Sequence, residues 1–297
     1  MAIKMRLIKD YMRNDSLRHE LNALTEKTFC FNFENWVTQG YFEGEYIPYS
    51  FEENGKVISN VSANLMKFMQ NGKIRNYIQI GTVMTDENYR NQGFARRLME
   101  QILEDYKDKC DGIYLFANLS ALEFYRKIGF KEKRQYLYMM KEDAKPARDF
   151  SHGDFKPVTS DEAEQKKRYM DYVRKSAPCG AFEQINKYGL QMFYTGGLDN
   201  VYYSETLDCF IVLETDGGVA ELQSIISLRS ISLSEVICRI CAEYETLRLG
   251  FTPRKEDAHL FDRRVYDGGD DYRLFCLGDK LDSIEEEKLY FPALSHA

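Results

Sequence analysis

The stretch Val83-Met-Thr-Asp-Glu-Asn-Tyr-Arg-Asn-Gln-Gly-Phe-Ala95 marks a passage from a strand into a helix. The run Ile74–Thr85 before it is predicted to be a strand, and Gly93–Tyr106 carries apolar residues at helical spacing. A helix that begins here presents free backbone N–H groups and the positive end of its dipole, which suits a phosphate. Gly93 permits close approach of an oxygen, and Ala95 avoids a clash one step later. The junction therefore predicts an anion site.

Three predicted strands lead up to this junction. Pro48–Glu53 and Lys56–Met69 flank Asn54-Gly55, and Asn71-Gly72 precedes the third strand, so that two hairpin turns are predicted. The order of elements predicts an α/β (α+β) fold, a mixed and mainly antiparallel sheet flanked by helices. The remaining predicted elements of this half are strands at Ile3–Ile8, Ile113–Phe116 and Phe130–Met140, and helices at Ser16–Phe29, capped by Asn14 or Asp15, and at Ser120–Lys127.

The junction resembles the pyrophosphate loop of the GNAT superfamily of acyl-CoA-dependent N-acyltransferases, Arg/Gln-x-x-Gly-x-Gly/Ala. Arg90, Gly93 and Ala95 match that pattern. Glu87 stands where many members have proline, which removes stiffness from the loop but no hydrogen-bond donor. The segment before the loop also matches the family at Val83, Thr85 and Tyr89.

A second motif follows about thirty residues further on. Family members carry a helix with a tyrosine, then Gly-Phe and a strand, and here Tyr125 precedes Gly129-Phe130. The resemblance covers residues 1–140. It implies an N-acetyltransferase that moves an acetyl group from acetyl-CoA to a primary amine, by direct attack in a ternary complex. The alternative is a non-catalytic acyl-CoA-binding or interaction protein that keeps the GNAT fold.

The resemblance also implies roles for individual residues. The pyrophosphate would lie on the amides of residues 92–96, and the pantetheine arm along residues 83–85, whose amides would polarise the thioester carbonyl. Tyr125 would protonate the departing thiolate, although its spacing also suits a packed aromatic residue. Asn118 would either bind the CoA arm or cap its helix. The implied acetyl-CoA-binding residues are Val83, Met84, Thr85, Arg90, Asn91, Gln92, Gly93, Phe94, Ala95, Arg96 and Asn118.

The general base is not identified by the sequence. Glu34, Glu43 and Glu45 follow the first predicted helix, where family members place substrate-binding segments, but surface carboxylates are the favoured interpretation. The apolar tail suggests another source. His296 or the carboxylate of Ala297 could take the amine proton if the tail lies in the cleft between two domains. Deleting the last four residues would then remove turnover and spare CoA binding.

Charge divides the chain into a first half of residues 1–145, with net charge +2, and a second half of residues 146–297, with −9. The polar segment 142–157 between them reads as a linker. The second half is predicted to be a smaller, degenerate GNAT-like domain without a phosphate cradle, whose acidic wall attracts cationic acceptors. Its predicted elements are helices at Asp161–Lys175 and Ser234–Glu243, strands at Tyr202–Leu207, Cys209–Glu214, Val219–Ser227 and Thr246–Phe251, and a final hairpin turning at Asp267–Asp271.

Composition limits the remaining classes. The net charge of −7 argues against a nucleic-acid partner, and no apolar run reaches the ~18 residues of a membrane span. The N-terminus lacks the apolar core of a signal peptide, so a cytoplasmic protein is expected. The scattered cysteines and histidines predict no metal site. The expected partners are a small-molecule or peptide amine and, in a homodimer, a second copy of the chain.

Overall fold

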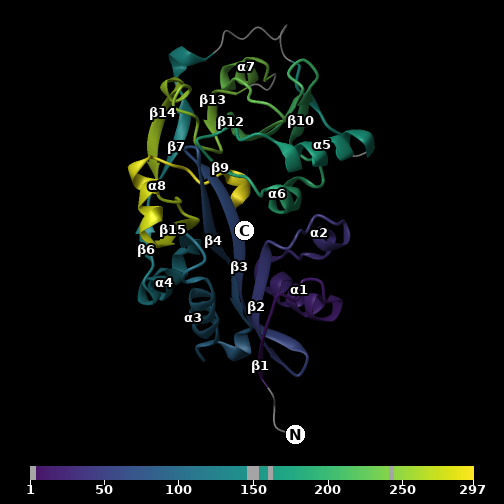
Figure 1. Ribbon diagram of the computed structural model, residues 1–297, viewed down its shortest axis with the longest axis vertical. Helices are drawn as coiled ribbons and strands as arrows, with labels where there is room; N and C mark the ends of the chain where they lie inside the picture. Colours follow the sequence, from purple (N-terminus) through teal and green to yellow (C-terminus); the bar gives the residue numbers. More distant parts are fainter. Residues whose placement is uncertain (1–4, 146–153, 160–162, 241–243) are drawn as a thin grey trace.

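A computed structural model describes residues 5–145, 154–159, 163–240 and 244–297. Two β-sheets follow each other along the long axis of the molecule (Figure 1). The first sheet consists, in spatial order, of β1 (Arg6–Lys9), β2 (Tyr46–Glu53), β3 (Lys56–Gln70), β4 (Lys73–Thr85), β5 (Gly112–Asn118), β15 (Tyr272–Leu277) and β6 (Lys131–Lys133), and β9 (Phe182–Gln184) pairs with β3.

The second sheet contains most of the strands of the second half. Its order is β14 (Phe261–Tyr266), β7 (Gln135–Met140), β13 (Thr246–Leu249), β12 (Val219–Ser227), β11 (Cys209–Asp216), β10 (Val201–Ser204) and β8 (Lys156–Pro157). Both sheets are mainly antiparallel, and one parallel pair lies in each, β4 with β5 and β12 with β13. The predicted fold class is thereby confirmed.

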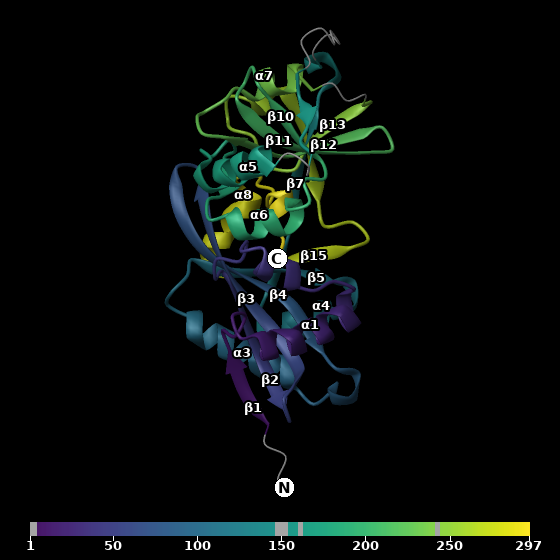
Figure 2. The same cartoon turned by 90° about the vertical axis from the view of Figure 1, so that its right-hand side faces the viewer.

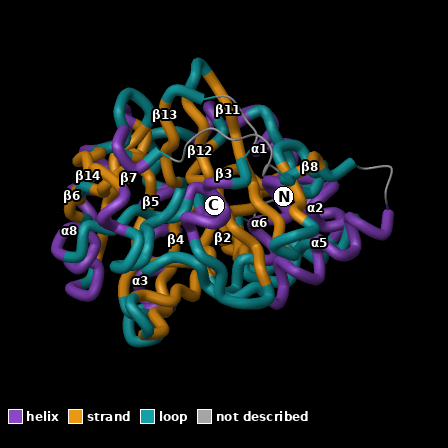
Figure 3. Tube along the Cα trace, turned by 90° about the horizontal axis from the view of Figure 1, so that it is seen from above, coloured by secondary structure: helices purple, strands orange, loops and turns teal. Residues whose placement is uncertain are grey.

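Helices flank the sheets, and several of them lie at the periphery of the molecule when it is seen from above (Figure 3). The first, α1 (Asp15–Phe29), is capped by Asn14, whose side chain accepts a hydrogen bond from the Leu17 N–H at 3.1 Å. No described helix is both long enough and apolar enough to cross a bilayer. The others are α2 (Glu34–Thr38), α3 (Phe94–Tyr106), α4 (Leu122–Ile128), α5 (Ala163–Lys175), α6 (Tyr188–Thr195), α7 (Leu233–Cys238) and α8 (Ser283–Glu286), with short 3-10 helices at Glu87–Tyr89, Leu119–Ala121, Glu142–Ala144, Ala258–Leu260, Asp279–Asp282 and Ala293–Ser295.

The predicted meander is present as β2, β3 and β4. Asn54 and Gly55 have φ of 52° and 87°, and Asn71 and Gly72 have 47° and 78°. Positive φ at both central residues is the geometry of the hairpin turns that Asn-Gly favours. Both turns were therefore predictable from four residues. The end of the predicted helix Ser234–Glu243 lies outside the described residues.

The predicted last strand of the first half, Phe130–Met140, is wrong. It breaks at Arg134 into β6, in the first sheet, and β7, in the second. In exchange, β15 of the second half lies between β5 and β6. The proposed domain boundary at residue 145 stays a prediction. Three strands cross it, because β7 joins the second sheet while β9 and β15 join the first.

The predicted final hairpin is also wrong, because β14 pairs with β7 while β15 pairs in the other sheet. Gly268 and Gly269, with φ of 106° and 62°, lie in the connection between them. In its observed position β15 has a partner on both edges, and its Leu274, Phe275 and Cys276 are at most 2% exposed. A terminal hairpin would leave one edge of β15 unpaired, which is unfavourable for buried backbone.

Candidate active site

A cavity begins where β4 and β5 separate. Their parallel pairing ends at Ile80 and Leu115. Beyond that point Gly81, Met84 and Thr85 pair only with β3, and residues 116–118 pair only with β15. The two strands border a cavity of about 920 Å³, which is lined by residues of both halves.

A β-bulge shapes the β4 side of this opening. Asn60 lies opposite Met84 but Ser62 lies opposite Gly81, so β4 has one extra residue, and Thr82 adopts a φ of +42°. That conformation is strained for a β-branched residue. The Asn60 amide stabilises it by donating to the Thr82 carbonyl at 2.9 Å. The bulge changes the direction of the backbone that follows Thr82.

The N-terminus of α3 borders the cavity. Gly93 precedes the helix with φ of +80° and contributes no side-chain cap. A Cβ built on Gly93 would meet nothing within 4 Å, so the space in front of the helix is open. Most of the predicted acetyl-CoA-binding residues line the cavity: Val83, Thr85, Arg90, Asn91, Gly93, Phe94, Ala95, Arg96 and Asn118.

Two predicted residues do not line it with their side chains. Met84 is 3% exposed, and its sulfur accepts the Thr25 hydroxyl at 3.8 Å on the α1 side of the sheet. The Gln92 amide donates to the Asn88 carbonyl at 3.4 Å. Both could therefore contribute through backbone only. Asn118 makes no side-chain capping bond to the 3-10 helix that follows it, so the structure does not support its alternative role as a cap.

Tyr125 lies in α4, lines the cavity and is 6% exposed. Its ring packs at an angle to Phe124 and Phe130, and its centroid lies 6.0 Å from that of Phe275 in β15. Burial raises the pKa of Tyr125 to about 12, which keeps the hydroxyl protonated at neutral pH. The side chain is both packed and able to donate a proton, so its predicted role remains open to test.

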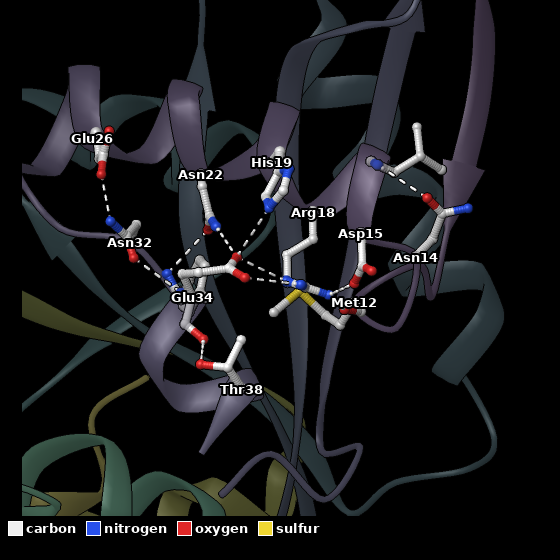
Figure 4. A network of polar contacts seen from close by, with 12 residues as sticks. Met12, Asn14, Asp15, Arg18, His19, Asn22, Glu26, Asn32, Glu34 and Thr38 are labelled. Carbon is white, nitrogen blue, oxygen red and sulfur yellow. Dashed lines mark hydrogen bonds and ion pairs between the residues drawn. The ribbon is translucent and has the colours of Figure 1, made fainter. Parts of the chain in front are cut away.

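Glu34, the first of the three candidate carboxylates, belongs to a structural network (Figure 4). The buried Arg18 guanidinium donates to both of its oxygens at 3.0 Å, and Asn22 donates at 3.1 Å. The bonds from Arg18 hold the pKa of Glu34 below its usual range. The network joins α1 to α2, and Glu34 does not line the cavity.

Glu43 and Glu45 differ from each other although they are two residues apart. Glu43 is exposed and forms an ion pair with Arg174 of α5. Glu45 lines the cavity, and its Oε2 is buried without a hydrogen-bond partner among the described residues. Burial raises the pKa of Glu45. The interpretation as a surface carboxylate therefore holds for Glu43 and is wrong for Glu45.

The tail of the chain enters the same cavity, and its end lies near the centre of the molecule (Figures 1 and 2). The His296 ring stacks on Phe116 at 3.8 Å between centroids, and its Nε2 has no partner in the described part of the chain. Burial lowers the pKa of His296 to about 4. The Ala297 carbonyl accepts the Gln79 amide at 3.3 Å.

The second half contributes residues to the site that the sequence did not predict. Leu190, Phe193 and Tyr194 of α6 line the cavity. The apolar run Tyr188–Thr195 was the available signal, but it is only two turns long. The expected acidic wall is wrong, because the described lining residues of the second half include no Asp or Glu.

Comparison with known proteins is consistent with this geometry. Residues 8–130 match the model of the Acetyltransferase (GNAT) family, so this part of the chain is a GNAT acetyltransferase domain. No curated protein sequence matches the chain significantly.

Solved structures resemble nearly the whole chain in fold. A probable N-acyltransferase of Enterococcus faecalis, described as a conserved protein of unknown function, has 16% identity and a TM-score of 0.58 over 92% of this chain and 72% of its own. A GCN5-related N-acetyltransferase of Kribbella flavida has 14% identity and a TM-score of 0.55, over 92% and 71%. Eis1 of Mycobacterium abscessus has 12% identity and a TM-score of 0.54, over 92% of this chain and 73% of its own. Identities this low show the fold alone.

Proposed function

We propose that the protein is an N-acetyltransferase that moves an acetyl group from acetyl-CoA to a primary amine, in a ternary complex. One observation carries the proposal. The open edge of β4, the uncapped N-terminus of α3 and the Tyr125 side chain all border a single cavity. Acyl transfer from acyl-CoA is what the GNAT family match makes expected.

The residues at the N-terminus of α3 suit a pyrophosphate. A 13-residue helix presents unpaired N–H groups and a positive dipole end toward the cavity. Gly93 leaves the approach open, and Arg90 and Arg96 line the same region. Phosphate groups are bound in this way at helix N-termini. The backbone of residues 83–85, unpaired on the β5 side, would bind the pantetheine arm as an added strand does.

The chemistry of the step is an acyl transfer. The nitrogen of the neutral amine forms a bond to the thioester carbonyl carbon, and the carbon–sulfur bond breaks. Backbone N–H groups of residues 83–85 would stabilise the charge on the carbonyl oxygen. Tyr125, protonated at neutral pH, would give its proton to the departing thiolate. The amine in turn releases one proton.

We assign the acceptance of that proton to the tail. His296 is neutral at pH 7 because its pKa is about 4, which leaves Nε2 free but makes it a weak base. Ala297 lies next to Gly81, at the point where the strands separate. Ser295 is 1% exposed, so the four-residue deletion would also disturb packing. Replacing His296 by Ala removes the imidazole, and removing Ala297 shifts the terminal carboxylate by one residue. Wild-type turnover in both variants would contradict a role of the tail.

The decisive experiment combines acetyl-CoA calorimetry with CoA release over a panel of primary amines. The proposal expects saturable acetyl-CoA binding and amine-dependent CoA release. Binding without release from any amine would indicate the non-catalytic alternative. Absence of binding would contradict both.

The other expectations from the sequence stay predictions. They concern a small-molecule or peptide acceptor, no nucleic-acid or membrane partner, a cytoplasmic location and a homodimer. The described residues contain no cluster of His, Cys, Asp and Glu side chains that could hold a metal ion, and metal-free chemistry likewise stays a prediction.

A further inference from the structure

One side of the cavity is an aromatic wall built by both halves of the chain. We define it as Phe31, Phe33, Trp36 and Phe193. The Phe193 ring lies 5.7 Å from Phe31 and 5.8 Å from Trp36, and Phe31 lies 5.4 Å from Phe33. All four residues line the cavity. Such a surface binds the apolar part of a ligand.

A carboxylate adjoins this wall. Glu45 is the only Asp or Glu among the described lining residues of the cavity. A Cβ on Gly189 would lie 3.1 Å from the unpartnered Glu45 Oε2 and 3.6 Å from the Trp36 ring, so carboxylate and wall meet at α6. Arg174, the neighbouring cation, is paired with Glu43 and lies over the Tyr188 ring. Desolvation of the Glu45 carboxylate outweighs the attraction of Arg174, and a bound cation would offset that cost.

The backbone that carries the carboxylate is separated from the strand that borders the expected reacting centre. The Glu45 carbonyl accepts the Leu65 N–H at 2.8 Å, and Leu65 lies opposite Ile78 of β4. Glu45 is therefore two strand spacings, about 10 Å, from the backbone of β4. The thioester is expected beside residues 81–85 of that strand. A second ammonium group at the other end of a spacer would bridge this separation.

We infer that Glu45 binds a second, non-reacting ammonium group of the acceptor, whose apolar spacer packs on the aromatic wall while the other amine reaches the opening between β4 and β5. The acceptor class is thus a diamine with an apolar spacer. The inference rests on the proposed function, because it assumes that an amine is acetylated at that opening. We call the place where Glu45 would bind this second ammonium group the distal site.

Octylamine and octamethylenediamine test the inference, because they share a spacer and differ in the distal amine. For the wild-type protein we expect the diamine to have the higher kcat/KM by about 10–100-fold, the worth of a hydrogen bond to a buried charge. This ratio exceeds the advantage that a diamine has simply because either of its two equal amino groups can react. Glu45→Gln should bring the ratio close to that statistical value, mainly through KM. Glu43→Gln, two residues away, should retain the wild-type ratio.

The outcomes separate the inference from the proposed function. Equal kcat/KM for both amines in the wild-type protein, or a diamine preference that survives Glu45→Gln, overturns the distal site while acetyl transfer stands. If acetyl-CoA binds but neither amine releases CoA, the proposed function fails for these acceptors. In that case, calorimetry of both amines with CoA-saturated protein tests the distal site directly. Tighter diamine binding that Glu45→Gln removes supports the site, and equal binding overturns it.

Discussion

The chain contains the same strand–helix–strand unit twice, as β4–α3–β5 and as β12–α7–β13, each with its strands parallel. In the first unit Gly93 precedes the helix and adds no cap, so the N–H groups face the cavity. In the second unit the Ser232 side chain accepts a hydrogen bond from the Glu235 N–H. The first helix thus has no side-chain cap on its N–H groups, whereas Ser232 caps the second.

The gaps beside the two helices differ as well. Beyond Ile80 the first gap is a cavity. In the second unit Gly250 donates to the Leu222 carbonyl at 2.9 Å, and its own carbonyl accepts the Ala293 N–H at 2.7 Å. A Cβ on Gly250 would lie 3.1 Å from the Ala293 side chain. The same topology therefore leaves a cavity beside the first unit, whereas residues around Ala293 fill the corresponding space beside the second unit.

The largest expected effect comes from the hydroxyl of Tyr125, which lies in α4 after the first unit and lines the cavity. Tyr125→Phe should lower kcat by roughly 10²–10⁴ and leave acetyl-CoA affinity intact. Tyr138→Phe is the control from the second sheet, where the hydroxyl donates to the Lys288 carbonyl at 2.8 Å. A loss below about threefold in Tyr125→Phe would leave the ring with a packing role only.

The pH profile sharpens the same comparison. Burial raises the pKa of Tyr125 to about 12, so its acid form persists as pH rises. The kcat profile should therefore show no falling limb from Tyr125 up to about pH 10. A falling limb near the ordinary tyrosine pKa, absent from the profile of Tyr125→Phe, would contradict the burial of the Tyr125 hydroxyl.

The helix N-termini provide the next contrast. Gly93→Glu should weaken acetyl-CoA binding by roughly 100-fold in calorimetry, because a negative side chain enters the phosphate site and an L-residue is strained at a φ of +80°. Ser232→Glu places the same charge at the capped helix and should leave that affinity unchanged. Unchanged affinity in Gly93→Glu would refute the phosphate site.

The exchanged strand is expected to affect activity less. Phe275 of β15 and Phe261 of β14 are 0% and 3% exposed, and each replacement by Ala should cost about 3–5 kcal/mol in unfolding free energy. Only Phe275→Ala should also lower kcat, by about tenfold, because that ring packs near Tyr125. Denaturant titration and CoA release at a temperature where both variants are folded measure the two effects. Equal kcat values would mean that β15 supports the sheet alone.

Two glycines give the smallest contrast. A Cβ on Gly81 would lie 2.6 Å from the Ala297 carbonyl oxygen, so Gly81→Ala should displace the tail and lower kcat by roughly threefold to tenfold. Gly250→Ala meets the Gln223 backbone at 2.8 Å and should cost about 1–3 kcal/mol of stability without that loss of turnover. Reversed results would show that the tail is not part of the working site.

Local signals predicted much of the first sheet. The Asn-Gly turns, the Asn14 cap and the Gly93 junction each depend on a few consecutive residues, and the structure contains all three. The strand exchange had no such signal, because β7 and β15 read as ordinary strands wherever they pair. Helix α6 is short, and it is stabilised by contacts such as the bond from the Trp36 indole N–H to the Gly189 carbonyl at 2.7 Å.

The sequence by itself determined the fold class and the strand-to-helix junction with Gly93, because backbone geometry and helix dipoles follow from neighbouring residues. Only the tertiary structure decided which of three nearby carboxylates forms no ion pair among the described residues. Glu34 and Glu43 are matched by Arg18 and Arg174, while Glu45 lines the cavity beside α6. Pairing of charges depends on side chains far apart in the chain, and no local pattern encodes their meeting.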